Sequence, residues 1–198
     1  MHGACPAGRL RRVASVCNAF CTLFVAACAN LPSGPPAHVD FASIDTPFAV
    51  EGRLSARHGA DAATVHFTWQ HRPPRDDLAV STPLGQTIAE LSGDTATARV
   101  EARTAEGRRD EAADWTTLTE RTLGFRLPVE GLAAWIRASP QRDIAYSIET
   151  DREGRVSLLR QAGWEIVYDY ADAASRNPNR LRITYPDLEI RMAIDRWQ

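Results

Sequence analysis

Cysteine has the widest chemistry of any residue type in this chain, because a thiolate can act as a nucleophile, a metal ligand or a covalent attachment point. The four cysteines are Cys5, Cys17, Cys21 and Cys28, and Cys28 follows an apolar run that ends in Val25-Ala26-Ala27. If the segment before Cys28 is removed, the mature chain keeps one cysteine and forms no internal disulfide. A single cysteine at the first mature position fits an attachment point better than a reactive thiol.

The first 27 residues have the layout of a secretory signal. They contain three arginines and no acidic residue, and residues 13–27 are mostly apolar. That run is too short and too interrupted for a transmembrane helix, which needs about 20 apolar residues. Its end resembles the lipobox of bacterial lipoproteins. The resemblance implies a lipoprotein signal peptide at 1–27, cleavage before Cys28, diacylglycerol on the Cys28 sulfur and acylation of the new amino group.

Other reactive groups form no recognisable site. The chain has no lysine, which excludes Schiff bases and the lysine of a phosphate-binding P-loop. It also lacks Gly-x-Ser-x-Gly, His-Glu-x-x-His, Gly-x-Gly-x-x-Gly and EF-hand motifs. The histidines His38, His58, His66 and His71 are scattered, and we expect them to be solvated surface residues. Asp76-Asp77 is predicted to be a charged turn after Pro73-Pro74. No catalytic residue, metal site or cofactor is therefore expected.

Net charge argues against nucleic acid as a partner. The formal charge is −2, and loss of the three signal arginines makes the mature chain more negative still. Nucleic-acid binders instead carry a basic patch or stripe. Residues 28–45 are rich in Pro, Gly, Ala and Ser, and they predict a lipidated flexible tether. One globular domain is expected over residues 46–198.

Apolar and polar residues alternate with period two from Phe48 onward, which predicts half-buried strands. The expected strands cover residues 48–57, 64–70, 78–82, 88–91 and 95–103, and later 145–149, 156–160, 165–170, 181–185 and 188–194. Apolar residues with helical spacing predict one helix that starts near Trp115 and is stopped by Gly124, and a second that begins at Pro128. About 9–11 short strands around a helical insertion predict a mainly β fold, an antiparallel sheet curled into a barrel or half-barrel.

Two apolar features stand out within this pattern. Four of the five tryptophans lie within predicted elements, where they either fill a plain core or line a cavity. Thr82-Pro83-Leu84-Gly85-Gln86 predicts a turn with Leu84 at its tip. Leu84 either folds back onto the core or stands exposed as an apolar finger that enters lipid or a partner.

Several short stretches together resemble the LolB family, the outer-membrane receptors of the bacterial lipoprotein localisation pathway. They lie in this order behind the lipobox: Gly52-Arg53-Leu54-Ser55-Ala56, Phe67-Thr68-Trp69-Gln70, Pro83-Leu84-Gly85, Gly131-Leu132-Ala133-Ala134-Trp135-Ile136, Gly163-Trp164-Glu165-Ile166-Val167-Tyr168, Asn177-Pro178-Asn179-Arg180-Leu181, and Leu188-Glu189-Ile190-Arg191-Met192 leading to Trp197. The family often has Asn where this chain has Thr82, so the start of the Leu84 turn can differ.

The resemblance implies a fold and a function. The fold is an incomplete antiparallel β-barrel with a helical lid over an apolar cavity. The function is to accept lipoproteins from the periplasmic carrier LolA and to insert their acyl chains into the inner leaflet of the outer membrane, with Pro83, Leu84 and Gly85 as the membrane-insertion loop. Ala29 replaces the aspartate that retains many lipoproteins at the inner membrane, so a place at the outer membrane, facing the periplasm, is expected. The partners would be LolA, cargo acyl chains and outer-membrane lipid, with the protein itself a monomer.

Strand alternation predicts which side chains line the cavity: Leu54, Val65, Phe67, Trp69, Val80, Trp135, Ile148, Ile166, Tyr168, Ile183, Ile190 and Met192. Two alternatives remain open. One is a structural or interaction lipoprotein with a solid core and no cargo cavity. The other is a lipid-modifying enzyme, which would need a convergent catalytic cluster.

Overall fold

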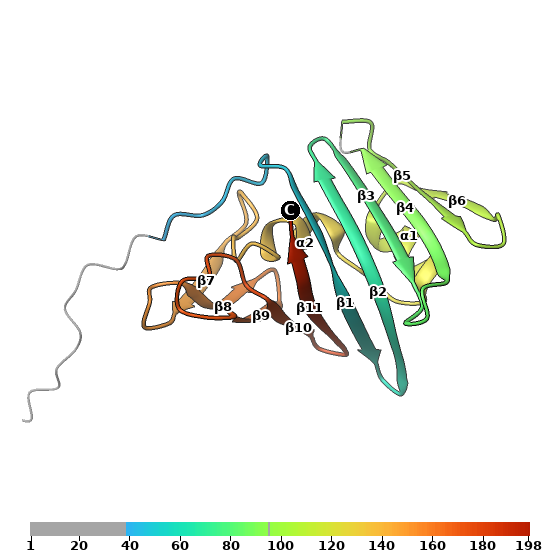
Figure 1. The fold of residues 1–198 in the computed structure, drawn as a ribbon. Coiled ribbons are helices and arrows are strands. Elements are labelled where there is room, and N and C mark those ends of the chain that lie inside the picture. Colours follow the sequence, from blue (N-terminus) through green and yellow to red (C-terminus); the bar gives the residue numbers. More distant parts are fainter. Residues whose placement is uncertain (1–38, 95) are drawn as a thin grey trace, which may run out of the picture. The chain divides into compact units, whose positions relative to one another are not determined.

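Alternating residues in the first half of the chain form six consecutive antiparallel strands (Figure 1). The computed structural model describes residues 39–94 and 96–198. The six strands are β1 (Phe48–His58), β2 (Asp61–Arg72), β3 (Arg75–Ser81), β4 (Thr87–Asp94), β5 (Arg99–Thr104) and β6 (Arg109–Ala112). Only β6 has no counterpart in the prediction, because Arg-Asp-Glu-Ala carries no apolar alternation.

Two short helices follow, α1 (Trp115–Leu123) and α2 (Val129–Trp135). The Asp114 side chain caps α1 by accepting a hydrogen bond from the Thr117 N–H at 2.8 Å. Gly124 ends α1 in the left-handed conformation, as predicted. Pro128 precedes α2, whose first turn has no side-chain cap. Helices of 9 and 7 residues are marginal in isolation, so both depend on packing against the sheet.

The second half of the chain adds five more strands to the same sheet. They are β7 (Tyr146–Thr150), β8 (Val156–Gln161), β9 (Trp164–Asp169), β10 (Arg180–Tyr185) and β11 (Leu188–Trp197). The sheet has eleven strands in the order β6-β5-β4-β3-β2-β1-β11-β10-β9-β8-β7. The first and last strands, β1 and β11, pair antiparallel in the middle of the sheet. The first half of the chain therefore runs strand by strand from the centre of the sheet to one edge, β6. The second half starts at the other edge, β7, and returns to the centre.

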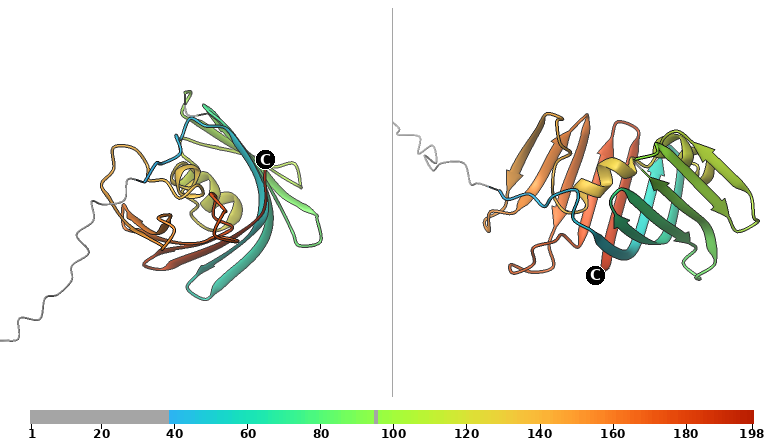
Figure 2. Two further views of the ribbon diagram at one scale, coloured as in Figure 1. Left: turned by 60° about the vertical axis from the view of Figure 1, so that its left-hand side comes forward. Right: turned by 90° about the horizontal axis from the view of Figure 1, so that it is seen from above.

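The sheet curves around α1 and α2, which lie inside the curve (Figure 2). Because β6 and β7 are the two edges and do not pair with each other, the barrel is incomplete. This architecture confirms the predicted mainly β fold, with an open antiparallel sheet and a helical lid. The predicted signal, Cys28 and the first part of the tether lie outside the described residues. No helix among residues 39–94 and 96–198 is long and apolar enough to cross a membrane.

A glycine allows the central strands to approach closely. The pairing of β1 with β11 shifts register between Glu51 and Gly52. A methyl group at Gly52 would collide with the backbone carbonyl of Ala193 on β11, so only glycine fits this bulge.

Antiparallel pairing also places several turns at one end of the sheet. The turns after β1, β3, β8 and β10 all lie there, because these four strands run in the same direction (Figure 1). We call it the Leu84 end, since the turn after β3 contains Leu84.

Candidate functional site

The turn after β3 presents its leucine to solvent. Leu84 is 90% exposed, more than any other large hydrophobic residue described. The Thr82 N–H donates to the Gln86 carbonyl at 2.8 Å, and the Gly85 N–H donates to the Thr82 carbonyl at 2.9 Å. Gly85 has a φ of 83°, which suits glycine. Leu84 thus stands out from a tightly bonded turn rather than folding back onto the core.

Thr82 starts this turn in place of the family's usual asparagine. Its hydroxyl oxygen accepts a hydrogen bond from the Gln86 N–H at 3.2 Å, the kind of local bond that favours serine, threonine and asparagine in turns. Thr82 therefore supplies a side-chain bond across the turn.

The twelve residues predicted to line the cavity lie on the inner face of the sheet or on the lid. Ten of them are buried, and Val65 and Ile148 are partly buried against the same core. The lid contributes further fully buried side chains that the predicted lining omits: Trp115, Leu118, Val129, Leu132 and Ile136. The helical spacing of these apolar residues predicted the two helices. The same spacing places them on one face of each helix, the face that packs against the sheet.

Side chains fill this interior in the structure. Trp69, Trp135, Ile166, Ile183 and Ile190 are each at most 1% exposed, so no water-sized void lies against them. The predicted residues come together as one packed core between sheet and lid. The lid and the inner face of the sheet are therefore in direct contact through these side chains.

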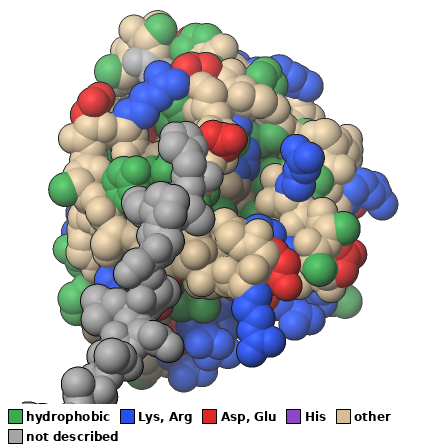
Figure 3. Space-filling model, turned by 90° about the vertical axis from the view of Figure 1, so that its left-hand side faces the viewer, with side chains coloured by type: hydrophobic (Ala, Val, Ile, Leu, Met, Phe, Trp, Pro, Cys, Tyr) green, Lys and Arg blue, Asp and Glu red, His purple; other side chains and the backbone are tan. Residues whose placement is uncertain are grey.

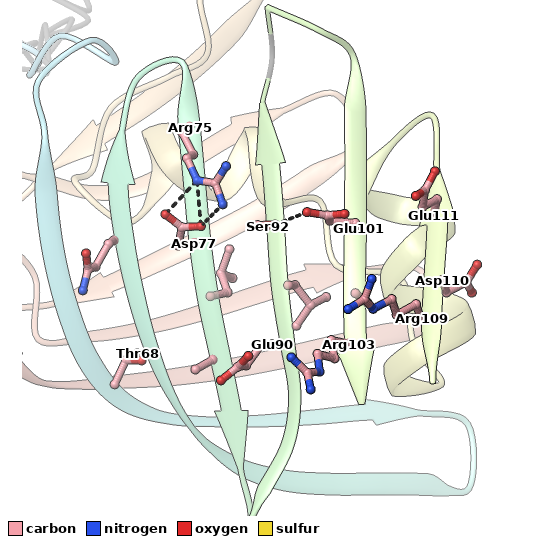
Figure 4. A pocket seen from close by; sticks show the side chains of 15 residues that line it. Thr68, Arg75, Asp77, Glu90, Ser92, Glu101, Arg103, Arg109, Asp110 and Glu111 are labelled. Atoms are coloured by element: carbon pink, nitrogen blue, oxygen red, sulfur yellow. Dashed lines mark hydrogen bonds and ion pairs between the residues drawn. The ribbon is translucent and has the colours of Figure 1, made fainter. Parts of the chain in front are cut away.

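The outer face of β2–β6 differs sharply from the inner face. It holds a hollow of about 630 Å³ lined largely by charged side chains (Figure 4). Arg75 pairs with Asp77, and the Ser92 hydroxyl donates to Glu101 at 3.3 Å. Exposed charges keep their hydration when no chain covers them, and an acyl chain laid over them would remove it. The inner face of the sheet is therefore the apolar one.

One glutamine holds the lid to the sheet. The Gln161 carbonyl oxygen on β8 accepts from the Trp135 indole N–H at 3.0 Å and from the Gln141 N–H at 2.8 Å. Its amide nitrogen donates to the Gln141 and Ile144 carbonyls, each at 3.0 Å. Gln161 is 2% exposed; its bond to Trp135 is buried, and its three bonds to Gln141 and Ile144 are partly buried.

Replacing Gln161 with leucine is expected to loosen this attachment. The buried Trp135 indole N–H would lose its acceptor, which lowers the free energy of unfolding by about 1–3 kcal/mol. Urea unfolding followed by tryptophan fluorescence measures the loss. The neighbouring variant Arg160→Gln removes only exposed ion pairs and should cost less than about 1 kcal/mol. Equal losses in the two variants would contradict the assigned role of Gln161.

The structure corrects the prediction for His71 and Asp76. Both lie inside strands and are 5% exposed, so His71 is not a solvated surface histidine and Asp76 is not in a turn. The turn consists of Pro73-Pro74 alone, and the pairing of β2 with β3 sets His71 directly opposite Asp76. The Asp76 carboxylate lies 2.7 Å from His71 Nδ1 and accepts from the Trp69 indole N–H at 2.7 Å.

His71 also holds the end of the predicted tether. Its Nε2 lies 2.7 Å from the Ile44 carbonyl. Both ring nitrogens therefore face acceptors, an arrangement that only a doubly protonated ring satisfies. Burial alone lowers the pKa of His71, but hydrogen bonds to Asp76 and Ile44 outweigh burial and raise the pKa above 6.5. Arg137, just after α2, donates to the Thr46 carbonyl at 3.1 Å and fixes the same segment.

Similarity to known proteins covers nearly all of the described chain. Residues 46–197 match the family model described as outer membrane lipoprotein LolB. A relative from Chromobacterium violaceum, called outer-membrane lipoprotein LolB, is 33% identical over 89% of this chain and 94% of its own length. A protein of the same name from Azoarcus is 35% identical over 78% of this chain and 80% of its own. A LolA-superfamily structure from Nitrosomonas europaea aligns with a TM-score of 0.47 at 7% identity, over 78% of this chain and 86% of that one.

Proposed function

Because this chain belongs to the outer-membrane lipoprotein LolB family, we propose that it accepts lipoproteins from the periplasmic carrier LolA and inserts their acyl chains into the inner leaflet of the outer membrane. Its place is the outer membrane, and its role lies in lipoprotein localisation. The lipid on Cys28 and the tether that follows would keep the domain within reach of the bilayer. The family is one of trafficking receptors, and residues 39–94 and 96–198 contain no cluster of side chains that could hold a metal ion.

One contrast carries this proposal: a large apolar face lies hidden under a small lid, while a single leucine is fully presented at one end of the sheet. The hidden face can bind hydrocarbon without aggregating when it is empty of cargo. The presented leucine can enter a bilayer without exposing that face.

The energetic problem is the passage of acyl chains through water. Burial is worth about 0.8 kcal/mol per CH₂, so three chains of roughly 15 methylenes would cost on the order of 36 kcal/mol to expose. The acyl chains must therefore move from the interior of the carrier to the interior of this protein without contact with water. The packed core gives way to acyl chains, which replace one set of apolar contacts with another. Direction follows from increasing affinity, from carrier to receptor to membrane.

The packed interior also favours a second candidate, an anchored interaction lipoprotein without cargo. Core residues that are at most 1% exposed are what such a protein would show. The two candidates differ in whether the lid yields to a hydrocarbon chain.

A two-step assay tests the proposed function. The mature chain is first mixed with a fluorescent fatty acid, and then with LolA carrying a lipoprotein and with lipid vesicles. We expect saturable probe binding, displacement of the probe by cargo, and transfer of cargo to the vesicles only when the protein is present. A protein that neither binds the probe nor takes cargo from LolA would support the interaction lipoprotein instead.

A further inference from the structure

A hollow of about 430 Å³ opens beside the lid at the Leu84 end of the sheet. It lies between the α1–α2 linker, the start of β9 and the turn from β10 to β11. Phe125 and Leu188 line it and are 9% and 7% exposed, so its floor is the edge of the hydrophobic core. Its volume falls within the roughly 300–1,000 Å³ of small-molecule pockets.

Aromatic rings lead from this hollow into the interior. Tyr185, on its rim, is 44% exposed and lies 4.7 Å from the Trp164 ring, centroid to centroid. Trp164 in turn lies 5.7 Å from Trp135 of the lid, which is 1% exposed. A side chain at Gly163 would come within 3.1 Å of the Tyr185 ring, so this glycine lets the tyrosine lie flat over the backbone. The three rings form a continuous apolar path from solvent to core.

Charged groups surround the mouth of the hollow. His58 and Asp187 are 3.0 Å apart on one side, and Arg126 and Glu120 are 3.9 Å apart on the other. All four side chains are largely exposed. A polar rim over an apolar floor matches an amphipathic ligand, with the hydrocarbon inside and the ester and amide groups at the rim.

The hollow lies at the same end of the sheet as the exposed leucine. His58, Trp164 and Tyr185 are the terminal residues of their strands at the Leu84 end. Tryptophan and tyrosine prefer the interface between membrane and water, where one part of the ring is apolar and the other is hydrated. A bilayer that takes up Leu84 would thus meet this end of the sheet.

We propose that this hollow is the portal through which cargo acyl chains pass between the inner face and the membrane, and that Trp164 is its gate. The portal takes an acyl chain whose glyceryl group stays at the charged rim. Movement of the Trp164 ring away from Trp135 would open the path without full removal of the lid. This inference rests on the proposed function and specifies its exit route.

A photocrosslinking experiment tests the portal. Benzoylphenylalanine is placed at position 185 or, as a control, at position 146 of the mature chain, and cargo is transferred from LolA to vesicles of phosphatidylethanolamine and phosphatidylglycerol under illumination. Tyr146 is a control of similar exposure, at 48%, on the edge strand β7 against Phe41; it lines a neighbouring hollow that reaches Trp164 from the other side and does not include Tyr185. On the face of the molecule shown in Figure 3, hydrophobic side chains are interspersed with charged and other side chains. We expect adducts with the lipid part of the cargo at position 185 and none at 146.

A charge at the portal provides the second readout. In Tyr185→Glu, each acyl chain must pass a carboxylate, so delivery should slow by at least about tenfold, while Tyr146→Glu should deliver at the normal rate. Normal delivery by Tyr185→Glu, or equal adducts at both positions, would overturn the portal and leave the proposed function standing. Failure of the unmodified protein to take cargo from LolA would instead refute the function itself.

Discussion

Replacing Leu84 with glutamate is expected to leave uptake of cargo from the carrier unchanged and to reduce delivery to membranes by at least about tenfold. Burial of a leucine side chain contributes about 1.5–3 kcal/mol, and a carboxylate in its place would oppose contact with the bilayer. Leu84 is 90% exposed and contributes nothing to the core, so the substitution should not affect folding. The measurement is a two-step transfer assay in which carrier release and vesicle capture are followed separately.

Two variants separate hydrophobicity from charge in this experiment. Leu84→Phe keeps an apolar tip and should deliver normally. Gln70→Glu adds the same charge to the outer face, where it lines the polar hollow, and should also deliver normally. Normal delivery by Leu84→Glu would show that the exposed leucine has no part in insertion.

Removing the carboxylate of Asp76 is expected to cause the largest loss of stability. In Asp76→Ala, the buried imidazolium of His71 and the indole N–H of Trp69 lose their common acceptor. Breaking a buried ion pair from one side costs about 3–5 kcal/mol, a large part of the roughly 5–15 kcal/mol that stabilises a domain. Urea unfolding at fixed pH measures the change. A loss below 1 kcal/mol, as is usual for an exposed ion pair, would contradict this role.

The same pair should make the stability depend on pH. The folded state raises the pKa of His71 above 6.5, so it binds the proton more tightly than the unfolded chain does. The stabilising contribution is therefore complete below pH 6.5 and is lost as the pH rises through the raised pKa. Unfolding free energies measured from about pH 6 to about pH 9 should fall in the native chain and fall less in Asp76→Ala. His66→Gln, on the opposite face of β2, serves as the control and should keep the native slope.

Period-two alternation was sufficient to predict most strands, because each has one face against the core. The same alternation also indicated that His71 and Asp76 are buried, which our prediction missed. His71 has the same parity as Phe67 and Trp69, and Asp76 has the same parity as Leu78 and Val80. Charge made these two positions look exposed, but residues of equal parity share a face of a strand whatever their polarity. Strand β6 offered no such signal, since it lies at an edge and its one apolar residue, Ala112, is only partly buried.

Some features of the candidate site could be predicted from the sequence and others could not. A leucine between proline and glycine could be placed at a turn tip, and the inward face of the sheet could be identified residue by residue. The sequence could not predict whether that face is empty or filled, because this depends on how closely the lid approaches. Gln161 bonds to Trp135 of the lid and to Gln141 and Ile144 of the following loop, 17 to 26 positions away, and no local pattern records these bonds. The hollow beside Trp164 escaped prediction for the same reason, since its walls come from four separate parts of the chain.

The central pairing of β1 with β11 has a consequence for biogenesis. The strand that begins the domain needs the strand that ends it, so the middle of the sheet cannot close until the last residues have been synthesised and have crossed the inner membrane. Contacts between residues so distant in sequence form slowly, because the whole intervening loop must be ordered first. The topology thus delays completion of the sheet until the C-terminal strand β11 is available to pair with β1.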